Sequence, residues 1–507
     1  MIIVTPAQMK FLEAEADRNG NSYEKLMETA GTKLAEKIKE MLSESVVKNV
    51  VFLCGNGNNA GDCFVAARIL ENSDIKCFAA MLCGKPKTDI AEKNFNRLGS
   101  TEILENADEI KKLLNSGNIS LVADGVFGTG FHGELPENIR VIFSMCNGIK
   151  TLAIDVPSGG NCMTGAAAKG MFAADETLTF GYNKVGMTQY PLKSFCGKIS
   201  VADIGIPDSY SEKFEYIIKE TGFDTLRNIL PHRNPDSHKG DYGRLLTVCG
   251  SESMPGACIM ALEAAVKSGA GLVQAAVPKA LMPVIAARLP EVMLVPLETD
   301  DDGYITADNY EKIINLSCKA TAVLAGCGLG VTEQTKILMK KLVSNLKCPI
   351  IIDADGINCI KVCIDIIRQS MSDIIVTPHP AEMGRLCSKT TDMVQSDRLQ
   401  TALELIKECN NLTVVLKGAG TVIAGSDKVF INPNGNPGMA KGGSGDVLAG
   451  IIASLKAQGL SSLECASLGA FVHGLAGDMA ASSLSMQSMT AMDIVKKLPK
   501  AFKEITE

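Results

Sequence analysis

Short apolar runs alternate with amphipathic stretches in the first part of the chain. Apolar runs at residues 50–54, 76–82, 120–123 and 151–154 predict buried strands, and helical patterns fall between them, the first at about residues 62–70. Continuous apolar strands separated by helices are typical of βαβ units and a parallel sheet. The pattern therefore predicts an α/β domain.

The same alternation begins again near residue 244. A strand is predicted at 244–250, a helix at 255–268 with Pro255 at its first position, and further strands at 273–277, 322–325, 349–352, 374–376 and 414–416. The stretch before this second block is polar and contains Pro231 and Pro235. We therefore predict two three-layer α/β/α domains, residues 1–220 and residues 221–507.

Length and composition fit this division and exclude several classes of protein. At 507 residues the chain exceeds what one hydrophobic core usually serves, and a net charge of −7 without any basic run argues against nucleic-acid binding. The first residues do not resemble a signal peptide, and no apolar run is long enough to span a bilayer. The 17 cysteines include no CxxC pair, as expected for reduced thiols. We expect a cytoplasmic homo-oligomer without nucleic-acid or membrane partners.

Two glycine-rich turns in the second block carry the strongest chemical signal. Residues 442–450 form a glycine turn that leads into an apolar helical pattern, with Asp446 just inside it. Free N–H groups at such a helix start suit a phosphate, and a nearby carboxylate can move a proton. The second turn, residues 417–421, contains a lysine and a threonine and follows an apolar strand. Each turn alone could simply permit close helix–strand packing, but together they favour a nucleotide site.

Polar residues in the first block cluster where predicted strands end. These clusters are residues 55–62, 124–133 and 155–159. Open parallel sheets bind ligands beyond the carboxyl ends of their strands. Each cluster could instead be a turn that needs Gly, Asn or Asp for its dihedral angles, but three at successive strand ends favour a binding site. The spacing differs from the GxGxxG dinucleotide motif, because Asn58 and Asn59 follow Gly57.

These motifs resemble two known domain families. The first block resembles the NAD(P)H-hydrate epimerase domain, which is Rossmann-like, at residues 26–31, 55–62, 124–133, 155–159 and 203–207. The second resembles the ADP-dependent NAD(P)H-hydrate dehydratase domain, a ribokinase relative, at residues 238–243, 326–330, 353–355, 377–382, 417–421 and 442–450. The order of the two blocks is similar to that of bifunctional NAD(P)H-hydrate repair enzymes.

The resemblance implies repair of hydrated NADH and NADPH. Water adds across a double bond of the reduced nicotinamide ring and gives two epimers, R and S, called NAD(P)HX. The epimerase would interconvert them, and the dehydratase would remove water from the S epimer at the expense of ADP. The ligands implied are therefore NAD(P)HX and ADP, and the choice between ADP and ATP and between NADHX and NADPHX stays open.

The resemblance also assigns residues to the epimerase. Asp155 would act as acid and base, and a potassium ion would be held by Asn59, Asp124 and Ser158. The residues that would contact the hydrate are Asn58, Asn59, Ala60, Gly61, Asp62, Gly128, Thr129, Gly130, Phe131, His132, Gly133 and Glu134.

In the dehydratase, Asp446 would be the base acting on the substrate hydroxyl. Ala257, Gly328 and His379 would contact the hydrate, and Lys417, Gly418, Ala419, Gly420, Thr421 and Gly445 would hold the nucleotide. Magnesium would reach the site through nucleotide phosphates and water. From the residues alone, His379 could also be a turn histidine between two prolines, and Asp353 and Asp355 could bind metal-bound water or cap the following helix.

A few positions depart from the family pattern, and two other functions stay open. Ala60 replaces a glycine and requires a negative φ, Cys63 occupies a position where glycine is common, and Gly160 replaces a larger apolar residue. The alternatives are a ribokinase-like small-metabolite kinase and a non-catalytic nucleotide-binding protein. Loops 55–62 and 124–133 argue against the kinase, and intact Asp155 and Asp446 argue against the non-catalytic protein.

Overall fold

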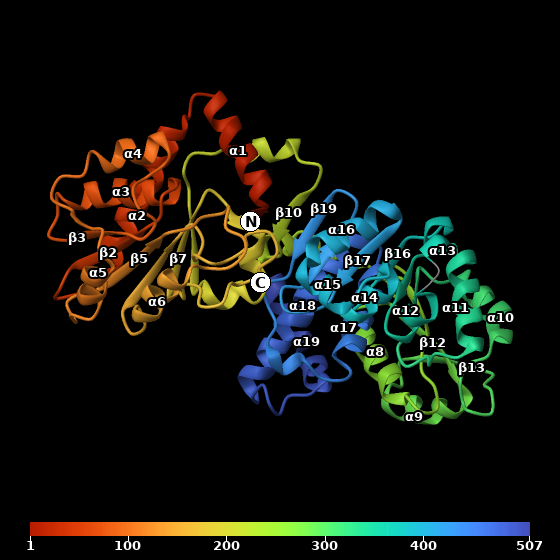
Figure 1. The fold of residues 1–507 in the computed structure, drawn as a ribbon. Helices are drawn as coiled ribbons and strands as arrows, with labels where there is room; N and C mark the ends of the chain where they lie inside the picture. Colours follow the sequence, from red (N-terminus) through yellow and green to blue (C-terminus); the bar gives the residue numbers. More distant parts are fainter. Residues whose placement is uncertain (362–363) are drawn as a thin grey trace. The chain divides into compact units, whose positions relative to one another are not determined.

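The chain forms two compact α/β units. The computed structural model describes residues 1–361 and 364–507. One unit consists of residues 2–217, and the other of residues 218–507 together with Met1. Figure 1 colours the first unit from red to yellow and the second from yellow-green to blue. Within the described residues, no helix has the length and apolar character needed to cross a membrane.

The first unit is built on a seven-stranded sheet with the order β4-β3-β2-β5-β6-β7-β9. All neighbouring strands in it are parallel. A separate parallel pair joins β1 to β8. The strands are β1 (Ile2–Val4), β2 (Asn49–Cys54), β3 (Lys76–Met81), β4 (Glu102–Leu104), β5 (Leu121–Gly125), β6 (Lys150–Ile154), β7 (Glu176–Phe180), β8 (Asn183–Lys184) and β9 (Lys198–Ala202).

Helices cover both faces of this sheet. Leu34 and Phe64 of α2 and α3 pack with Phe52 of β2 on one face, and on the other face Ile110 and Ile139 of α5 and α6 pack with its neighbour Leu53. Successive residues of a strand point to opposite faces, so β2 is apolar throughout. The helices are α1 (Pro6–Arg18), α2 (Tyr23–Met41), α3 (Asn58–Leu70), α4 (Asp89–Phe95), α5 (Ala107–Leu114) and α6 (Glu137–Met145).

The second unit contains a larger sheet, in which the strands run in the order β13-β12-β11-β14-β15-β16-β17-β18-β19. The pairs from β13 to β17 are parallel, and β18 and β19 are added as antiparallel strands. The strands are β11 (Arg244–Val248), β12 (Leu272–Pro278), β13 (Met293–Leu297), β14 (Ala322–Ala325), β15 (Ile350–Ile352), β16 (Ile374–Val376), β17 (Leu412–Leu416), β18 (Val422–Ala424) and β19 (Lys428–Ile431); β10 (Ile217–Glu220) spans the unit boundary.

Both faces of the second sheet are also buried. Ile351 joins the core formed with α8, α17, α18 and α19, while its neighbours Ile350 and Ile352 are equally buried and point to the opposite face. The helices are α7 (Phe223–Arg227), α8 (Pro255–Lys267), α9 (Met282–Arg288), α10 (Tyr310–Ser317), α11 (Glu333–Asn345), α12 (Asp355–Ile360), α13 (Ile364–Gln369), α14 (Pro380–Cys387), α15 (Thr391–Ser396), α16 (Arg398–Glu408), α17 (Ser444–Ala457), α18 (Ser462–Ser483) and α19 (Ala491–Thr506).

Each parallel sheet has a point where the strand order reverses. In the first unit it lies between β2 and β5, and in the second between β11 and β14. Loops leave the carboxyl ends of two such strands in opposite directions and open a crevice, which is where α/β sheets bind ligands. The predicted α/β fold is confirmed. The polar clusters at residues 55–62 and 124–133 follow β2 and β5, which border the first of these points, and the cluster at 155–159 follows the next strand, β6.

Candidate functional site

A cavity of about 640 Å³ lies in the first unit beyond the ends of β2, β5 and β6. Its size is in the range of small-molecule sites. It is lined by these residues with a predicted role in the epimerase: Asn58, Asn59, Asp62, Gly128, Thr129, Gly130, Phe131, His132, Glu134 and Asp155. Gly55 is required here, because a Cβ atom would lie 1.9 Å from the carbonyl oxygen of Val126 in the neighbouring loop.

Three residues predicted to contact the hydrate do not line this cavity. Ala60 and Gly61 are buried inside α3, where a Cβ on Gly61 would lie 2.6 Å from Met27 of α2. Gly133 is exposed and has a φ of 88°, so it shapes a turn. The helical conformation of Ala60 supplies the negative φ that its methyl group requires.

Asp124, Ser158 and Asn59 are connected at one edge of the cavity, because Ser158 donates to Asp124 and both Ser158 and Asn59 donate to the Phe127 carbonyl oxygen. Asp124 is fully buried and accepts hydrogen bonds from the Ser158 hydroxyl and amide, both at 2.7 Å. The Asn59 amide donates to the carbonyl oxygens of Phe127 (3.1 Å) and Ile154 (3.2 Å). Burial raises the pKa of Asp124 to about 6 although these bonds oppose the shift. The group is therefore a cluster of oxygen atoms around a buried carboxyl.

Asp155 forms an ion pair with Lys184, a residue that the sequence analysis did not identify. The Lys184 side chain is completely buried and also donates to Thr179 Oγ1 (2.8 Å) and to the Phe180 carbonyl oxygen (3.0 Å). Asp155 has a left-handed φ of 63°, which is uncommon for a residue with a Cβ atom and is often found at functional sites. Lys184 had no motif to mark it, because it lies among Gly, Asn and Val and not in an apolar run.

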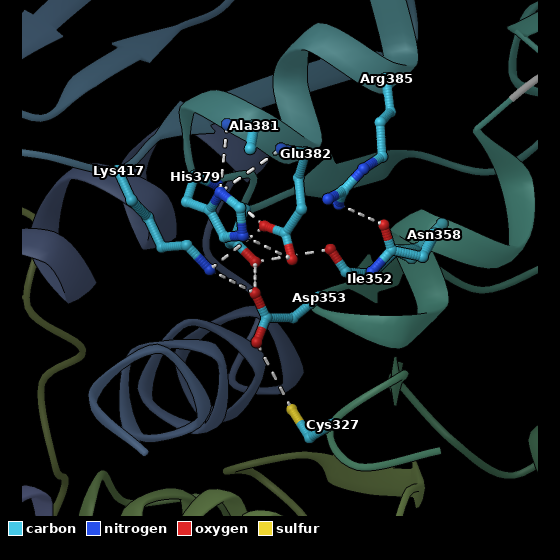
Figure 2. A network of polar contacts seen from close by, with 10 residues as sticks. Cys327, Ile352, Asp353, Asn358, His379, Ala381, Glu382, Arg385 and Lys417 are labelled. Carbon is cyan, nitrogen blue, oxygen red and sulfur yellow. Dashed lines mark hydrogen bonds and ion pairs between the residues drawn. The ribbon is translucent and has the colours of Figure 1, made fainter. Parts of the chain in front are cut away.

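In the second unit, Asp353 joins the ends of three neighbouring strands. Its Oδ1 atom accepts from Lys417 Nζ at 2.8 Å and from Thr377 Oγ1 at 2.6 Å, and its Oδ2 atom lies 3.7 Å from Cys327 Sγ (Figure 2). Asp353 is buried. Burial opposes protonation of Lys417, but the charges of Asp353 and Glu382 outweigh it and raise the pKa of Lys417.

His379 caps α14. Its Nδ1 atom accepts from the Ala381 amide at 3.1 Å, and Glu382 in return accepts from the His379 amide at 2.8 Å (Figure 2). Burial and the charge of Lys417 lower the pKa of His379. The turn interpretation of this histidine thus describes its local structure, and its Nε2 atom lies 3.5 Å from Oε1 of the capping Glu382.

Asp446 lies in the first turn of α17, beside Lys417. A Cβ on Gly445 would lie 3.2 Å from Lys417 Nζ, so glycine lets the lysine approach this turn. Burial, followed by the charge of Asp353, raises the pKa of Asp446 to about 6. One potential ligand atom from each of Cys327, Asp353 and Asp446 lies within 4.8 Å of the others. The site thus combines a helix N-terminus, an ammonium group and two carboxyl groups.

The turn after β17 is braced by Arg398, which the sequence analysis missed. Its guanidinium donates to the carbonyl oxygens of Leu416 and Ala419, both at 2.9 Å. Thr421 Oγ1 donates to the Gly418 carbonyl oxygen at 2.8 Å, which closes the turn. The turn is therefore ordered by its own contacts.

Two buried polar atoms near the start of α17 have no hydrogen-bond partner within the described part of the chain. They are Ser444 Oγ and His473 Nε2. Burial, and then the charge of Lys417, lower the pKa of His473 to about 4, so the imidazole is neutral at neutral pH. His473 was not predicted, because it lies within an apolar helix, α18, whereas Ser444 belongs to the predicted glycine turn at residues 442–450.

Ala257 and Gly328, the other predicted hydrate contacts of the second unit, lie next to each other. A Cβ on Gly328 would lie 2.9 Å from Ala257 Cβ. Asp353 and Asp355 do not cap α12, because its N-cap is Ala354 and has no side-chain cap. Asp355 instead accepts from the Gly330 amide at 2.9 Å. The capping interpretation was wrong for both.

Comparison with known proteins connects both units to one family. The family model described as NAD(P)H-hydrate dehydratase matches residues 245–500, and that of the YjeF-related protein N-terminus matches residues 23–186. The bifunctional NAD(P)H-hydrate repair enzyme Nnr of Thermofilum pendens is 37% identical over 100% of this chain and 97% of its own length. This chain belongs to the bifunctional NAD(P)H-hydrate repair enzyme family. The predicted family is confirmed.

Other relatives agree with this membership. The Nnr enzyme of Moorella thermoacetica is 34% identical over 100% of this chain and 98% of its own length. Among solved structures, a ribokinase-like superfamily protein of Enterococcus faecalis is 28% identical, with a TM-score of 0.51, and covers 57% of this chain and 96% of its own. The ribokinase-like fold predicted for the second block is therefore confirmed.

Proposed function

We propose that this protein restores hydrated NADH and NADPH through two activities. The first unit interconverts the R and S epimers of NAD(P)HX, and the second dehydrates the S epimer with ADP as the phosphate source. Membership of the bifunctional repair family supports both activities. The chain is thus an isomerase and a lyase.

The chemistry of the first unit follows from the structure of the hydrate. The reduced nicotinamide ring is an enamine, so water adds its hydroxyl to the carbon next to the ring nitrogen. Loss and return of this hydroxyl on opposite faces exchanges the epimers and needs proton transfer at oxygen. Asp155 lines the cavity and is held by Lys184, so we assign it this proton transfer.

The cluster of Asn59, Asp124 and Ser158 suits a potassium ion. A buried carboxyl group is costly unless a positive charge compensates it, and Asp124 is bonded to neutral Ser158 and Val126. Asn59 and Ser158 bring further oxygen atoms of the kind that hard cations prefer. We therefore propose Asn59, Asp124 and Ser158 as the site of a monovalent cation.

The second unit has the parts needed to make hydroxide a better leaving group. We propose that Asp446 takes the proton of the substrate hydroxyl, which is then phosphorylated and leaves as phosphate. The first-turn amides of α17, Lys417, and the unpartnered atoms of Ser444 and His473 are suited to the nucleotide phosphates. Magnesium bound by those phosphates would supply charge neutralisation, and the carboxyl groups of Asp353 and Asp446 would help to hold it.

The observation that carries the proposal is the presence of two separate chemical sites in one chain of this family. A small-metabolite kinase would need only the second site. Purified protein is incubated with S-NADHX and ADP, and NADH is followed by absorbance, with hydroxyethylthiazole and ATP as the alternative substrates. Recovery of NADH supports the proposal, while phosphorylation of the thiazole without NADH recovery contradicts it.

We further propose that the protein is a cytoplasmic homo-oligomer. Sedimentation of the full chain tests the oligomeric state.

A further inference from the structure

Four of the ionisable side chains that line the cavity of the first unit come from four different elements. Glu13 comes from α1, Asp62 from α3, Asp155 from the loop after β6 and Lys184 from β8. Three of them are carboxyl groups and one is an ammonium group. The cavity therefore contains more acids than Lys184 can neutralise.

Lys184 forms its ion pair with Asp155. Thr179 Oγ1 and the Phe180 amide also donate to Asp155 Oδ1, at 2.9 and 3.2 Å. All three groups therefore present a hydrogen-bond donor to the same oxygen atom of Asp155. Asp155 is thus arranged as the base of the cavity.

The surroundings of Glu13 differ from those of Asp155. Burial, and then the negative charge of Asp155, raise the pKa of Glu13 to about 6, against a smaller opposing effect of Lys184. Burial and the charges of Asp155 and Glu13 also raise the pKa of Asp62. Two carboxyl groups that line one cavity in different surroundings are a common arrangement for an acid and a base.

Epimerisation at one carbon requires such a pair. The hydroxyl must leave from one face as water, and water must return to the other face, so one group gives a proton while another accepts one. We propose that Glu13 is the second acid–base group of the epimerase and acts together with Asp155. This inference rests on the epimerase activity proposed for the first unit.

The step balances without any further reactant. Protonated Glu13 gives its proton to the hydroxyl, the C–O bond breaks, and the lone pair of the ring nitrogen forms a C=N bond as water leaves. A water molecule on the other face gives a proton to Asp155 and bonds to the carbon, and the C=N electrons return to nitrogen. In the reverse direction the two acids exchange roles, so the active state carries one proton on the pair.

The groups around Glu13 define its pH response. Its charge interacts with those of Asp155, Asp62 and Lys184, and it raises the pKa of Tyr23 of α2. His132 and Glu134 line the same cavity. As pH rises through about 6, Glu13 loses its proton beside Asp155 and the singly protonated state disappears. The rate should therefore fall on the alkaline side.

Glu13→Gln tests the inference, with Asp17→Asn as the matched control. Asp17 is an exposed carboxyl group on the same helix that accepts from the Tyr23 amide at 3.3 Å, a bond that asparagine keeps. Interconversion of purified epimers is measured by chromatography from pH 5 to 9, after subtraction of the uncatalysed rate, and NADHX binding is measured by calorimetry.

We expect Glu13→Gln to lower the rate about 10²–10⁴-fold and to bind NADHX within several-fold of wild type. Glu13→Asp should retain activity with a displaced alkaline limb, and Asp17→Asn should match wild type. A Glu13→Gln rate near wild type contradicts the role of Glu13. If Glu13→Gln does not fold, a pH profile of Glu13→Asp that matches wild type contradicts the role of Glu13 instead. A wild-type protein that does not epimerise NADHX contradicts the proposed function itself.

Discussion

Lys417 donates a hydrogen bond to Asp353 at 2.8 Å and thereby connects the end of β17 to the end of β15. Thr377, at the end of the strand between them, donates to the same carboxylate oxygen at 2.6 Å. Asp446 lies in the first turn of α17, and within the described residues no ammonium group lies at hydrogen-bond distance from its carboxyl group. This arrangement gives the two aspartates different roles, one in structure and one in proton transfer.

Removal of Lys417 should destabilise the second unit. In Lys417→Met the buried Asp353 loses its ion-pair partner, and breaking a buried pair in this way costs about 3–5 kcal/mol. Denaturant unfolding of the second unit should shift accordingly, while epimerisation persists in mild conditions. Lys428→Met removes an exposed pair with Asp427 and should change stability by about 1 kcal/mol or less. Equal effects of the two substitutions would show that the Lys417 pair contributes little.

Asp446→Asn should abolish dehydration and leave epimerisation intact. Asparagine keeps the size of the side chain but cannot take the hydroxyl proton, and the loss of a general base lowers rates about 10²–10⁴-fold. ADP affinity should stay within several-fold of wild type, because the proposed nucleotide contacts remain. The check is a pair of assays on one variant, NADH recovery from the S epimer and chromatographic epimer interconversion. A parallel fall of both activities would refute the separate roles of Asp446 and Asp155.

The dehydratase rate and the stability of the second unit should both report the raised pKa of Asp446. The base works when ionised, so kcat/KM should rise with pH through about 6. The folded protein holds this proton up to about 6 and the unfolded chain only to about 4, so Asp446 lowers stability progressively as pH rises between these values. Asp446→Asn should therefore melt higher than wild type at pH 7 but not at pH 3.5. A higher melting temperature for wild type than for Asp446→Asn at pH 7 would contradict the raised pKa of Asp446.

Epimerisation should depend on a monovalent cation. In Asp124→Asn the buried charge is removed, so hydrate binding to the first unit should weaken and lose its response to potassium. Epimer interconversion is measured in potassium, in sodium and in buffers without either ion. Wild-type rates that are the same in all three buffers would exclude a functional cation at Asn59, Asp124 and Ser158.

A fragment of residues 222–507 should fold and dehydrate alone. It retains the strands β11 to β19 and the complete second site. It should consume the S epimer with ADP and leave the R epimer to disappear only at the uncatalysed rate. Rapid consumption of both epimers by this fragment would show that epimerisation does not belong to the first unit, as we propose.

Local patterns in the sequence predicted most of the fold because the central strands are apolar on both faces. The run at 50–54 is an example, since β2 occupies Asn49–Cys54 and is buried almost throughout. In contrast, β9 (Lys198–Ala202) was not predicted, because most of its residues are only half-buried and no apolar run marks them.

The site was predicted where a turn carries its own signal, and missed where the fold alone creates a contact. Asp155 and Asp446 stand in recognisable Gly- or Pro-containing turns. The Asp155–Lys184 pair joins residues 29 positions apart, and Glu13 reaches the same cavity from a helix near the start of the chain. Such contacts depend on sheet order, which local periodicity does not reveal.

The central claim is that two different activities in one chain restore both epimers. The most direct measurement is the yield of NADH from an equal mixture of R- and S-NADHX, with excess ADP, magnesium and potassium, compared among the wild-type protein, Asp155→Asn and Asp446→Asn. We predict rapid and complete recovery with wild type, rapid recovery of only the S half with Asp155→Asn, and almost none with Asp446→Asn. Rapid complete recovery with Asp155→Asn, or no NADH from wild type, would contradict the account.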